Sequence, residues 1–343
     1  MQVALIGLPQ SGKRTLFTLL TGRAIPAGRT AEESVEGVAP INDPRVDRLA
    51  EICHPKKKTY AQNRLVLCPD ASLKGDDRAW LEAARKCELV CLVVRAFESD
   101  RVYHPSGSVD PGRDRSALES ELMLADLERV DTRLTRIGKE KRGHAGPEQA
   151  MEEKALHRAM AAMEEGRRLR DAGLEPHELR AIRSLGLLTL MPQLCVYNVS
   201  ESEAARSFGA GTMTVSALIE QEIAAMEDPG ERREYLRSMG LDASGLDRLN
   251  AAAYDALGLM SFYTIGPDEA RAWTIRKGAT APEAGGRIHT DMERGFIRVE
   301  VIRYDALLAA GSEAAAREAG RAHAKGRDYV LQDGDVCHFL FNV

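Results

Sequence analysis

Short, mainly apolar runs recur along the first two thirds of the chain, separated by more polar segments. They occupy residues 3–6, 64–68, 89–94, 187–198 and 212–217. An apolar run that does not alternate with polar residues is typical of a strand that is buried on both faces, as in a parallel sheet. The pattern therefore predicts an α/β fold, with helices in the segments between the runs.

The segments between the runs are more polar, and some carry helical spacing. In residues 44–53, Val46, Leu49 and Ile52 fall on one face, and Asp43 can cap this helix with Pro44 at its first position. Residues 246–257 likewise place leucine and alanine on one face. Residues 21–40 hold few apolar positions, so we expect a loop there, either over a ligand site or as a surface connection.

A long helical segment interrupts the alternation of strands and helices at residues 115–170. Its apolar residues recur at alternating spacings of four and three, which is the pattern of a coiled-coil seam. A glycine-containing break at residues 141–147 (KRGHAGP) reverses the chain, and Pro147 begins a second helix. The pattern predicts an antiparallel helical hairpin inserted into the α/β domain. The seam positions are Met123, Leu127, Val130, Leu134, Ile137, Leu156, Ala159 and Met163.

From residue 262 onward the pattern is dominated by strands again. Strands are predicted at residues 272–275, 297–302, 328–331 and 336–341, with one alanine-rich helix at residues 312–324. Several strands with one or two helices in about eighty residues are typical of a small α+β domain.

Composition narrows the class of protein only slightly. A chain of 343 residues allows two or three domains, and a net charge of −5 gives no sign of a nucleic-acid-binding protein. Contact with RNA would need a local basic patch. The six cysteines form no CxxC pair, and no apolar run reaches 18 residues. We expect a cytoplasmic, monomeric protein without membrane contact.

The first seventeen residues carry the clearest candidate chemistry. An apolar strand, a loop between Gly7 and Gly12, and a helix follow one another, which is the layout of a phosphate-binding loop. Backbone N–H groups of the loop can turn toward a phosphate, and Lys13 can reach the outer phosphates. The alternative is a glycine-rich turn without a ligand. The candidate phosphate-binding residues are Gly7, Pro9, Gln10, Ser11, Gly12, Lys13, Arg14 and Thr15.

One position of this loop departs from the usual pattern. Arg14 stands where a serine or threonine normally supplies a hydroxyl to Mg²⁺, and Thr15 offers the first hydroxyl one place later. Arginine has no acceptor atom and cannot bind a cation. Asp70, at the end of a buried strand, is the candidate that would hold Mg²⁺ through water, or else a turn or cap residue. The loop thus predicts phosphate binding with weakened Mg²⁺ binding.

Several stretches together resemble the YchF family of Obg-like P-loop ATPases. GLPQSGKRTLF is similar to the family's GLPNVGKSTLF, and further landmarks are DPRVDRLAEICHPKK, LVVRAFE and VDPGRDRSALESELMLADLERV. The longest match is C-terminal, where residues 266–305 and DYVLQDGDVCHFLFNV look like the family's TGS domain, a ubiquitin-like β-grasp unit. The resemblance covers nearly the whole chain. It implies a P-loop domain at residues 1–112 and 190–260, the helical insertion at 113–189 and the TGS domain at 261–343.

The resemblance also implies a base-binding site. NVSE at residues 198–201 is similar to the family's NxxE motif, which stands where GTPases have NKxD. The GTPase aspartate accepts from guanine N1–H and the 2-amino group, donors that adenine lacks, so its replacement removes the guanine preference. The implied ligand is ATP. The implied base-contacting residues are Asn198, Val199, Glu201, Ser216 and Ala217.

Four departures from the family pattern fall on Mg²⁺ and γ-phosphate handling. They are Arg14, the loss of the glycine from the family's DIAGL sequence at Asp70, the absence of a histidine from residues 73–80, and Thr30 as the sole candidate switch threonine. The resemblance therefore implies a nucleotide-binding protein with attenuated or absent hydrolysis that associates with ribosomes, translation factors or RNA. A nucleotide-independent scaffold and a slow GTPase remain alternatives.

Overall fold

The computed structural model describes residues 2–25, 33–73, 78–140 and 146–342. The chain forms two compact units. The first contains Met1–Val38 and Arg64–Leu249, and the second contains Ala39–Asn63 and Asn250–Val343. The chain therefore passes from one unit to the other at residues 38–39, 63–64 and 249–250.

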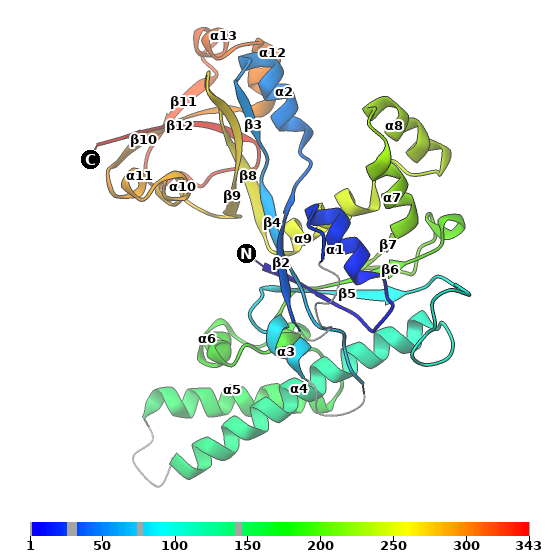
Figure 1. Cartoon of the computed structure of the whole chain (residues 1–343). Coiled ribbons are helices and arrows are strands. Elements are labelled where there is room, and N and C mark those ends of the chain that lie inside the picture. Colours follow the sequence, from blue (N-terminus) through cyan, green and yellow to red (C-terminus); the bar gives the residue numbers. More distant parts are fainter. Residues whose placement is uncertain (1, 26–32, 74–77, 141–145, 343) are drawn as a thin grey trace. The chain divides into compact units, whose positions relative to one another are not determined.

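The first unit is built on a six-stranded sheet in the order β2-β4-β1-β5-β6-β7 (Figure 1). β1 pairs in parallel with β4 and β5, and β6 pairs in parallel with β5 and β7. All seven residues of β5 are buried, and the unbroken apolar run at residues 89–94 predicts this for the first six. The predicted α/β class is confirmed. The strands are β1 (Gln2–Ile6), β2 (Val35–Pro40), β4 (Gln62–Leu67), β5 (Leu89–Arg95), β6 (Gln193–Asn198) and β7 (Thr212–Val215).

Two expectations for this sheet were wrong. Residues 35–40 form β2, where the sequence predicted a loop. The prediction failed because only Val35 and Ala39 of this strand are buried, and an apolar pattern of two positions is too short to detect. The strand predicted from residue 187 begins only at Gln193, because residues 188–190 form the 3-10 turn η3 (Leu188–Leu190).

Helices surround this sheet, and one core cluster joins Trp80, Leu92 and Leu118 from a helix, a strand and the helical insertion. Among the described residues, no helix has the length and apolar character needed to cross a membrane. The helices are α1 (Lys13–Thr21), α3 (Ala79–Ala84), α4 (Pro111–Glu140), α5 (Pro147–Glu164), α6 (Pro176–Ile182), α7 (Ala217–Ala225) and α8 (Pro229–Ser238), followed by α9 (Gly245–Ala256) where the chain leaves the unit.

The predicted helical hairpin is present as α4 and α5, which lie side by side (Figure 1). Val130, Ile137 and Leu156 are fully buried in one cluster between them. Every seam position named from the sequence belongs to that cluster or packs against it. The 3-10 turns η1 (Leu169–Asp171) and η2 (Arg183–Leu185), on either side of α6, connect the hairpin back toward β6.

The second unit has its own six-stranded sheet, in the order β11-β10-β12-β8-β9-β3. β10 runs antiparallel to β11 and β12, β8 runs antiparallel to β9, and β12 pairs in parallel with β8. Phe262, Val299 and Phe339 form the centre of its core. The strands are β3 (Lys57–Thr59), β8 (Leu259–Thr264), β9 (Glu269–Arg276), β10 (Phe296–Arg303), β11 (Ala322–Lys325) and β12 (Asp335–Phe341).

Residues 39–63, which the sequence assigned to the first domain, pack within this second unit. Helix α2 (Pro44–Cys53) begins as predicted, with Asp43 accepting from the backbone N–H of Arg45 at 3.1 Å. The Tyr263 hydroxyl donates to Asp43, and β3 pairs in parallel with β9. These contacts join residues that are more than two hundred positions apart, so local patterns do not reveal them.

The C-terminal expectations were partly wrong. The alanine-rich helix predicted over 312–324 ends at Glu318, because Gly320 adopts a φ of +67° and residues 322–325 form β11. Residues 328–331 form no strand, and Val330 makes a single isolated bridge with Thr280. The remaining helices are α10 (Ala281–Ile288), α11 (Thr290–Arg294), α12 (Tyr304–Ala310) and α13 (Glu313–Glu318).

Candidate functional site

The loop between β1 and α1 is folded as a turn that only glycine fits at two positions. A Cβ on Gly7 would lie 2.5 Å from the carbonyl oxygen of Val93, and a Cβ on Gly12 would collide with the side-chain amide of Asn198. Gly12 also adopts a φ of +89°, which favours glycine. Gly7 is therefore required by the close approach of the Val93 backbone, and Gly12 by its positive φ and the neighbouring Asn198 side chain. Gln10 adopts a positive φ of 63° and is exposed at the tip of the loop.

Lys13 is the first residue of α1 and is almost completely buried, with 2% of its surface exposed. Its ammonium nitrogen lies 2.9 Å from the carbonyl oxygen of Pro69 and 3.2 Å from that of Gly7. It also forms an ion pair of 2.6 Å with Asp70. Burial lowers the pKa of Lys13, and the charge of Asp70 offsets part of that effect.

Asn198 connects the phosphate loop to the other candidate segment of the site. Its Nδ2 donates to the carbonyl oxygen of Ser11 at 3.1 Å, and its Oδ1 accepts from the backbone N–H of Ala217 at 3.1 Å. The parallel register of β6 and β7 brings these groups together, because Asn198 is opposite Val215 at the carboxyl ends of both strands. Three stretches that the sequence identified separately therefore meet at one edge of the sheet.

The other candidate base-contacting residues differ in how accessible they are. Val199 is buried in the core beneath the sheet, so its side chain is a packing residue. Glu201 is exposed at the start of the 3-10 turn η4 (Glu201–Glu203). Ser216 precedes α7 and is buried, and within the described chain its hydroxyl has no hydrogen-bond partner. The same holds for the hydroxyl of Ser11. Unpartnered buried hydroxyls on the two joined loops leave donors available for a ligand.

The candidate metal-binding residues fit Mg²⁺ only in part. Thr15 is half-buried in the first turn of α1, while Arg14 is exposed beside it. Asp70 directs its carboxylate at Lys13 rather than at an open position. No group of three or more histidine, cysteine, aspartate or glutamate side chains suited to a metal occurs among the described residues. An ion at this loop would therefore depend on the phosphates of a nucleotide for most of its ligands.

Some predicted features of the site cannot be placed. Thr30 and the central part of the 73–80 loop, residues 74–77, lie outside the described residues. The contact that sequence reasoning missed is the ion pair of Asp70 with Lys13. Both residues were identified as candidates, but their pairing depends on the register of β1 with β4, which no local pattern encodes.

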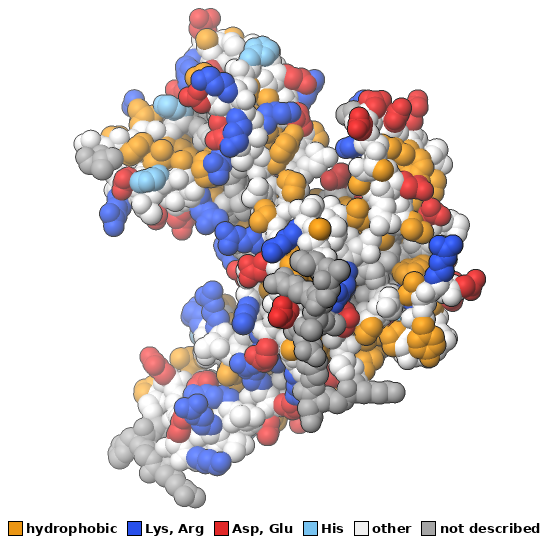
Figure 2. Space-filling view, viewed as in Figure 1, with side chains coloured by type: hydrophobic (Ala, Val, Ile, Leu, Met, Phe, Trp, Pro, Cys, Tyr) orange, Lys and Arg blue, Asp and Glu red, His pale blue; other side chains and the backbone are white. Residues whose placement is uncertain are grey.

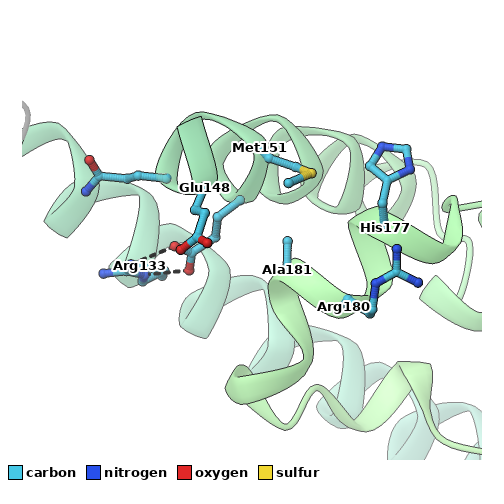
Figure 3. Close-up of a pocket in the computed structure, with 8 residues that line it drawn as sticks. Arg133, Glu148, Met151, His177, Arg180 and Ala181 are labelled. Carbon is cyan, nitrogen blue, oxygen red and sulfur yellow. Dashed lines mark hydrogen bonds and ion pairs between the residues drawn. The ribbon is translucent and has the colours of Figure 1, made fainter. Parts of the chain in front are cut away.

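A separate cavity of about 490 Å³ lies within the helical part of the first unit (Figure 3). His177 and Arg180 of α6 lie at one end of it, and Met151 of α5 lies above Ala181. At the other end, Arg133 donates two hydrogen bonds of 2.7 Å to Glu152. None of the candidate nucleotide-binding residues lines this cavity, so it is distinct from the phosphate loop.

Comparisons with known proteins give a consistent result over the whole chain. A family model, YchF-GTPase_C, described as "Protein of unknown function (DUF933)", matches residues 259–342. The chain is 38% identical over 360 aligned positions to the Ribosome-binding ATPase YchF of Haemophilus influenzae, covering 99% of this chain and 98% of that protein. It is 37% identical over 367 positions to the protein of the same name from Bacillus subtilis, covering all of both chains.

The fold comparison agrees with the sequence comparison. The structure is similar to the solved structure of the Schizosaccharomyces pombe YchF GTPase, with a TM-score of 0.86 and 30% sequence identity. The similarity covers 99% of this chain and 97% of that one.

Proposed function

The chain belongs to the YchF family, and on that premise we propose that it binds an adenine nucleotide, hydrolyses it slowly or not at all, and associates with ribosomes. The observation that carries the proposal is the contact of Asn198 with both Ser11 and Ala217. These hydrogen bonds hold the phosphate loop and the candidate base loop together without a ligand. A preformed site of this kind lowers the conformational cost of binding.

Adenine preference is proposed from the residues that would face the base. Glu201 is exposed and stands where a guanine-reading aspartate would be expected, four positions into the NVSE sequence. Asn198 uses one amide hydrogen and one acceptor position in its backbone contacts, so a second N–H and a further lone pair remain for a purine. Discrimination between adenine and guanine then depends on whether the buried polar groups of the site find hydrogen-bond partners on the edge of the base.

Attenuated hydrolysis is proposed from the groups around the γ-phosphate position. Arg14 cannot supply a metal ligand, and the sequence DASLKG at residues 70–75 stands in place of the family's DIAGL without its glycine. Phosphoryl transfer relies on metal and backbone donors placed against developing charge. The loss of one such donor typically lowers the rate by about a hundredfold or more.

Ribosome association is proposed from the names of the relatives, which are ribosome-binding ATPases. On the visible face of the helical hairpin, side chains of both charges are interspersed (Figure 2). Sedimentation of the protein with ribosomes in the presence of ATP, ADP or neither tests the association. Binding that is equal under all three conditions would favour the scaffold alternative.

Nucleotide preference is tested by calorimetric titration of ATP, ADP and GTP, each with and without Mg²⁺. We expect ATP and ADP to bind more tightly than GTP, because Glu201 replaces the aspartate that in a GTPase accepts from the guanine amino group. The Lys13→Ala variant is the control and should lose most of the affinity. Tighter binding of GTP would contradict adenine preference, and no binding of any nucleotide would favour the scaffold.

A further inference from the structure

The ammonium group of Lys13 has no free hydrogen in the structure. An ammonium has three N–H donors, and three acceptors lie within 3.2 Å: the carbonyl oxygens of Gly7 and Pro69, and the carboxylate of Asp70. Since Lys13 is only 2% exposed, water has little access to its ammonium group. A phosphate that binds Lys13 must therefore displace one of these acceptors.

Of the three acceptors, Asp70 is the one that can leave. The two carbonyl groups belong to backbone that the sheet holds in place, since Cys68 donates to Leu5 at 3.1 Å and Ala71 donates to Gly7 at 3.0 Å. The Asp70 side chain is 26% exposed and can rotate toward solvent. Its carboxylate is also the acceptor whose charge is repelled by an approaching phosphate.

We propose that Asp70 is a positioning residue. It forms an ion pair with Lys13 in the empty protein and releases Lys13 to the phosphates when a nucleotide binds. This inference rests on the proposed nucleotide binding. Without Mg²⁺, binding must break the ion pair and leave a carboxylate beside the phosphates. With Mg²⁺, the released carboxylate faces a cation, so part of this penalty is recovered. Asp70 therefore ties nucleotide affinity to the metal, while Arg14 loosens that dependence.

The test compares Asp70→Asn with the unchanged protein in titrations of ADP, first in EDTA and then in saturating Mg²⁺. In EDTA we expect Asp70→Asn to bind ADP roughly tenfold more tightly, equivalent to about 1.4 kcal/mol. In Mg²⁺ this advantage should shrink or reverse, since the variant has no carboxylate for the cation. Asp131→Asn, an exposed position on α4, removes the same charge elsewhere and should change neither affinity.

Failure of this inference and failure of the proposed nucleotide binding would give different results. If the unchanged protein and Asp70→Asn bind ADP equally in EDTA, or if the variant binds more weakly, Asp70 does not restrain Lys13 and only this inference is overturned. If neither protein binds ADP or ATP with or without Mg²⁺, the proposed nucleotide binding fails and the inference fails with it. A purely structural role for Asp70 would not reverse its effect between EDTA and Mg²⁺.

A second measurement examines the empty protein alone. Free energies of unfolding of Lys13→Met, Asp70→Asn and the double variant form a double-mutant cycle, which isolates the energy of the pair. The inference requires the two changes to be non-additive, with the double variant less destabilised than the sum of the single changes. Strict additivity would overturn it, because Asp70 would then not hold Lys13 in solution.

Discussion

Gly12 shows how much of the site depends on the absence of a single side chain. Its φ of +89° is one that other residues rarely adopt, and a Cβ there would meet the Asn198 amide. This amide is the group that joins the phosphate loop to Ala217. Gly12 therefore affects both halves of the candidate site at once, although a glycine has no side chain that could contact a ligand.

We predict that Gly12→Ala weakens nucleotide binding at least tenfold, because the added methyl group displaces Asn198. Gly22, at the other end of α1, provides a matched control. It has a φ of +64°, and nothing lies within 4 Å of the position that an added methyl group would occupy. Gly22→Ala should lower the free energy of unfolding by about 1 kcal/mol through backbone strain, and leave affinity unchanged. Equal affinities of the two variants in calorimetry would contradict this role of Asn198.

The ion pair of Lys13 with Asp70 marks the limit of what residue patterns predicted at the site. The phosphate loop was predicted because its glycines, lysine and flanking elements are contiguous. The pairing was not, because Lys13 and Asp70 are brought together by the register of β1 with β4. The sequence also does not show on which side of the sheet the Val199 side chain lies, and in the structure it is buried in the core.

At the scale of elements, prediction succeeded where the apolar pattern was long and failed where pairing decided the structure. The buried apolar run of β5 at residues 89–94 and the seam of α4 and α5 were both evident from the sequence. In contrast, β3 reads KKT and is a strand only because β9 pairs with it. β11 likewise forms because β10 presents an antiparallel edge, and its sequence alone favoured a continued helix.

The helical hairpin is anchored by a buried carboxylate that the seam pattern does not reveal. Asp126 of α4 is fully buried and lies next to the seam position Leu127. It accepts from Arg85 at 2.8 Å, from the backbone N–H groups of Leu188 and Thr189 at 3.0 and 2.7 Å, and from the Thr189 hydroxyl at 2.8 Å. These bonds attach α4 to the end of α3 and to η3.

We predict that Asp126→Asn lowers the free energy of unfolding by about 3 kcal/mol. The amide removes the charge that balances the buried Arg85, and breaking a buried pair typically costs about 3–5 kcal/mol. Urea unfolding measures the change. Asp131→Asn, five residues along the same helix and exposed, is the control and should stay within about 0.5 kcal/mol of the unchanged protein. If Asp126→Asn also lowered the free energy of unfolding by less than about 0.5 kcal/mol, the charge of Asp126 would not be what attaches α4 to α3 and η3.

At the scale of the whole molecule, the fold and family were predictable because the resemblance extends along nearly all of the chain. The assignment of residues 39–63 to the second unit was not predictable. This segment lies between two strands of the first sheet in sequence, yet Asp43 accepts from Tyr263 and Lys57 pairs with Glu269. Long-range contacts of this kind are absent from any local pattern.

The final prediction concerns ATP turnover, which depends on how many of the groups around the γ-phosphate act together. A site that transfers a phosphoryl group contributes mainly position and electrostatics, so each lost donor lowers the rate separately. Here Arg14 supplies no metal ligand, and the sequence DASLKG at residues 70–75 lacks the glycine of the family's DIAGL sequence, so we expect hydrolysis near the background rate. Arg14→Ser should strengthen Mg²⁺ binding without restoring ordinary turnover, because the other departures remain. Release of phosphate from ATP over many turnovers measures the rate, with Lys13→Ala as the control. Turnover many orders of magnitude above spontaneous hydrolysis, and abolished by Lys13→Ala, would show that the remaining groups are sufficient for catalysis.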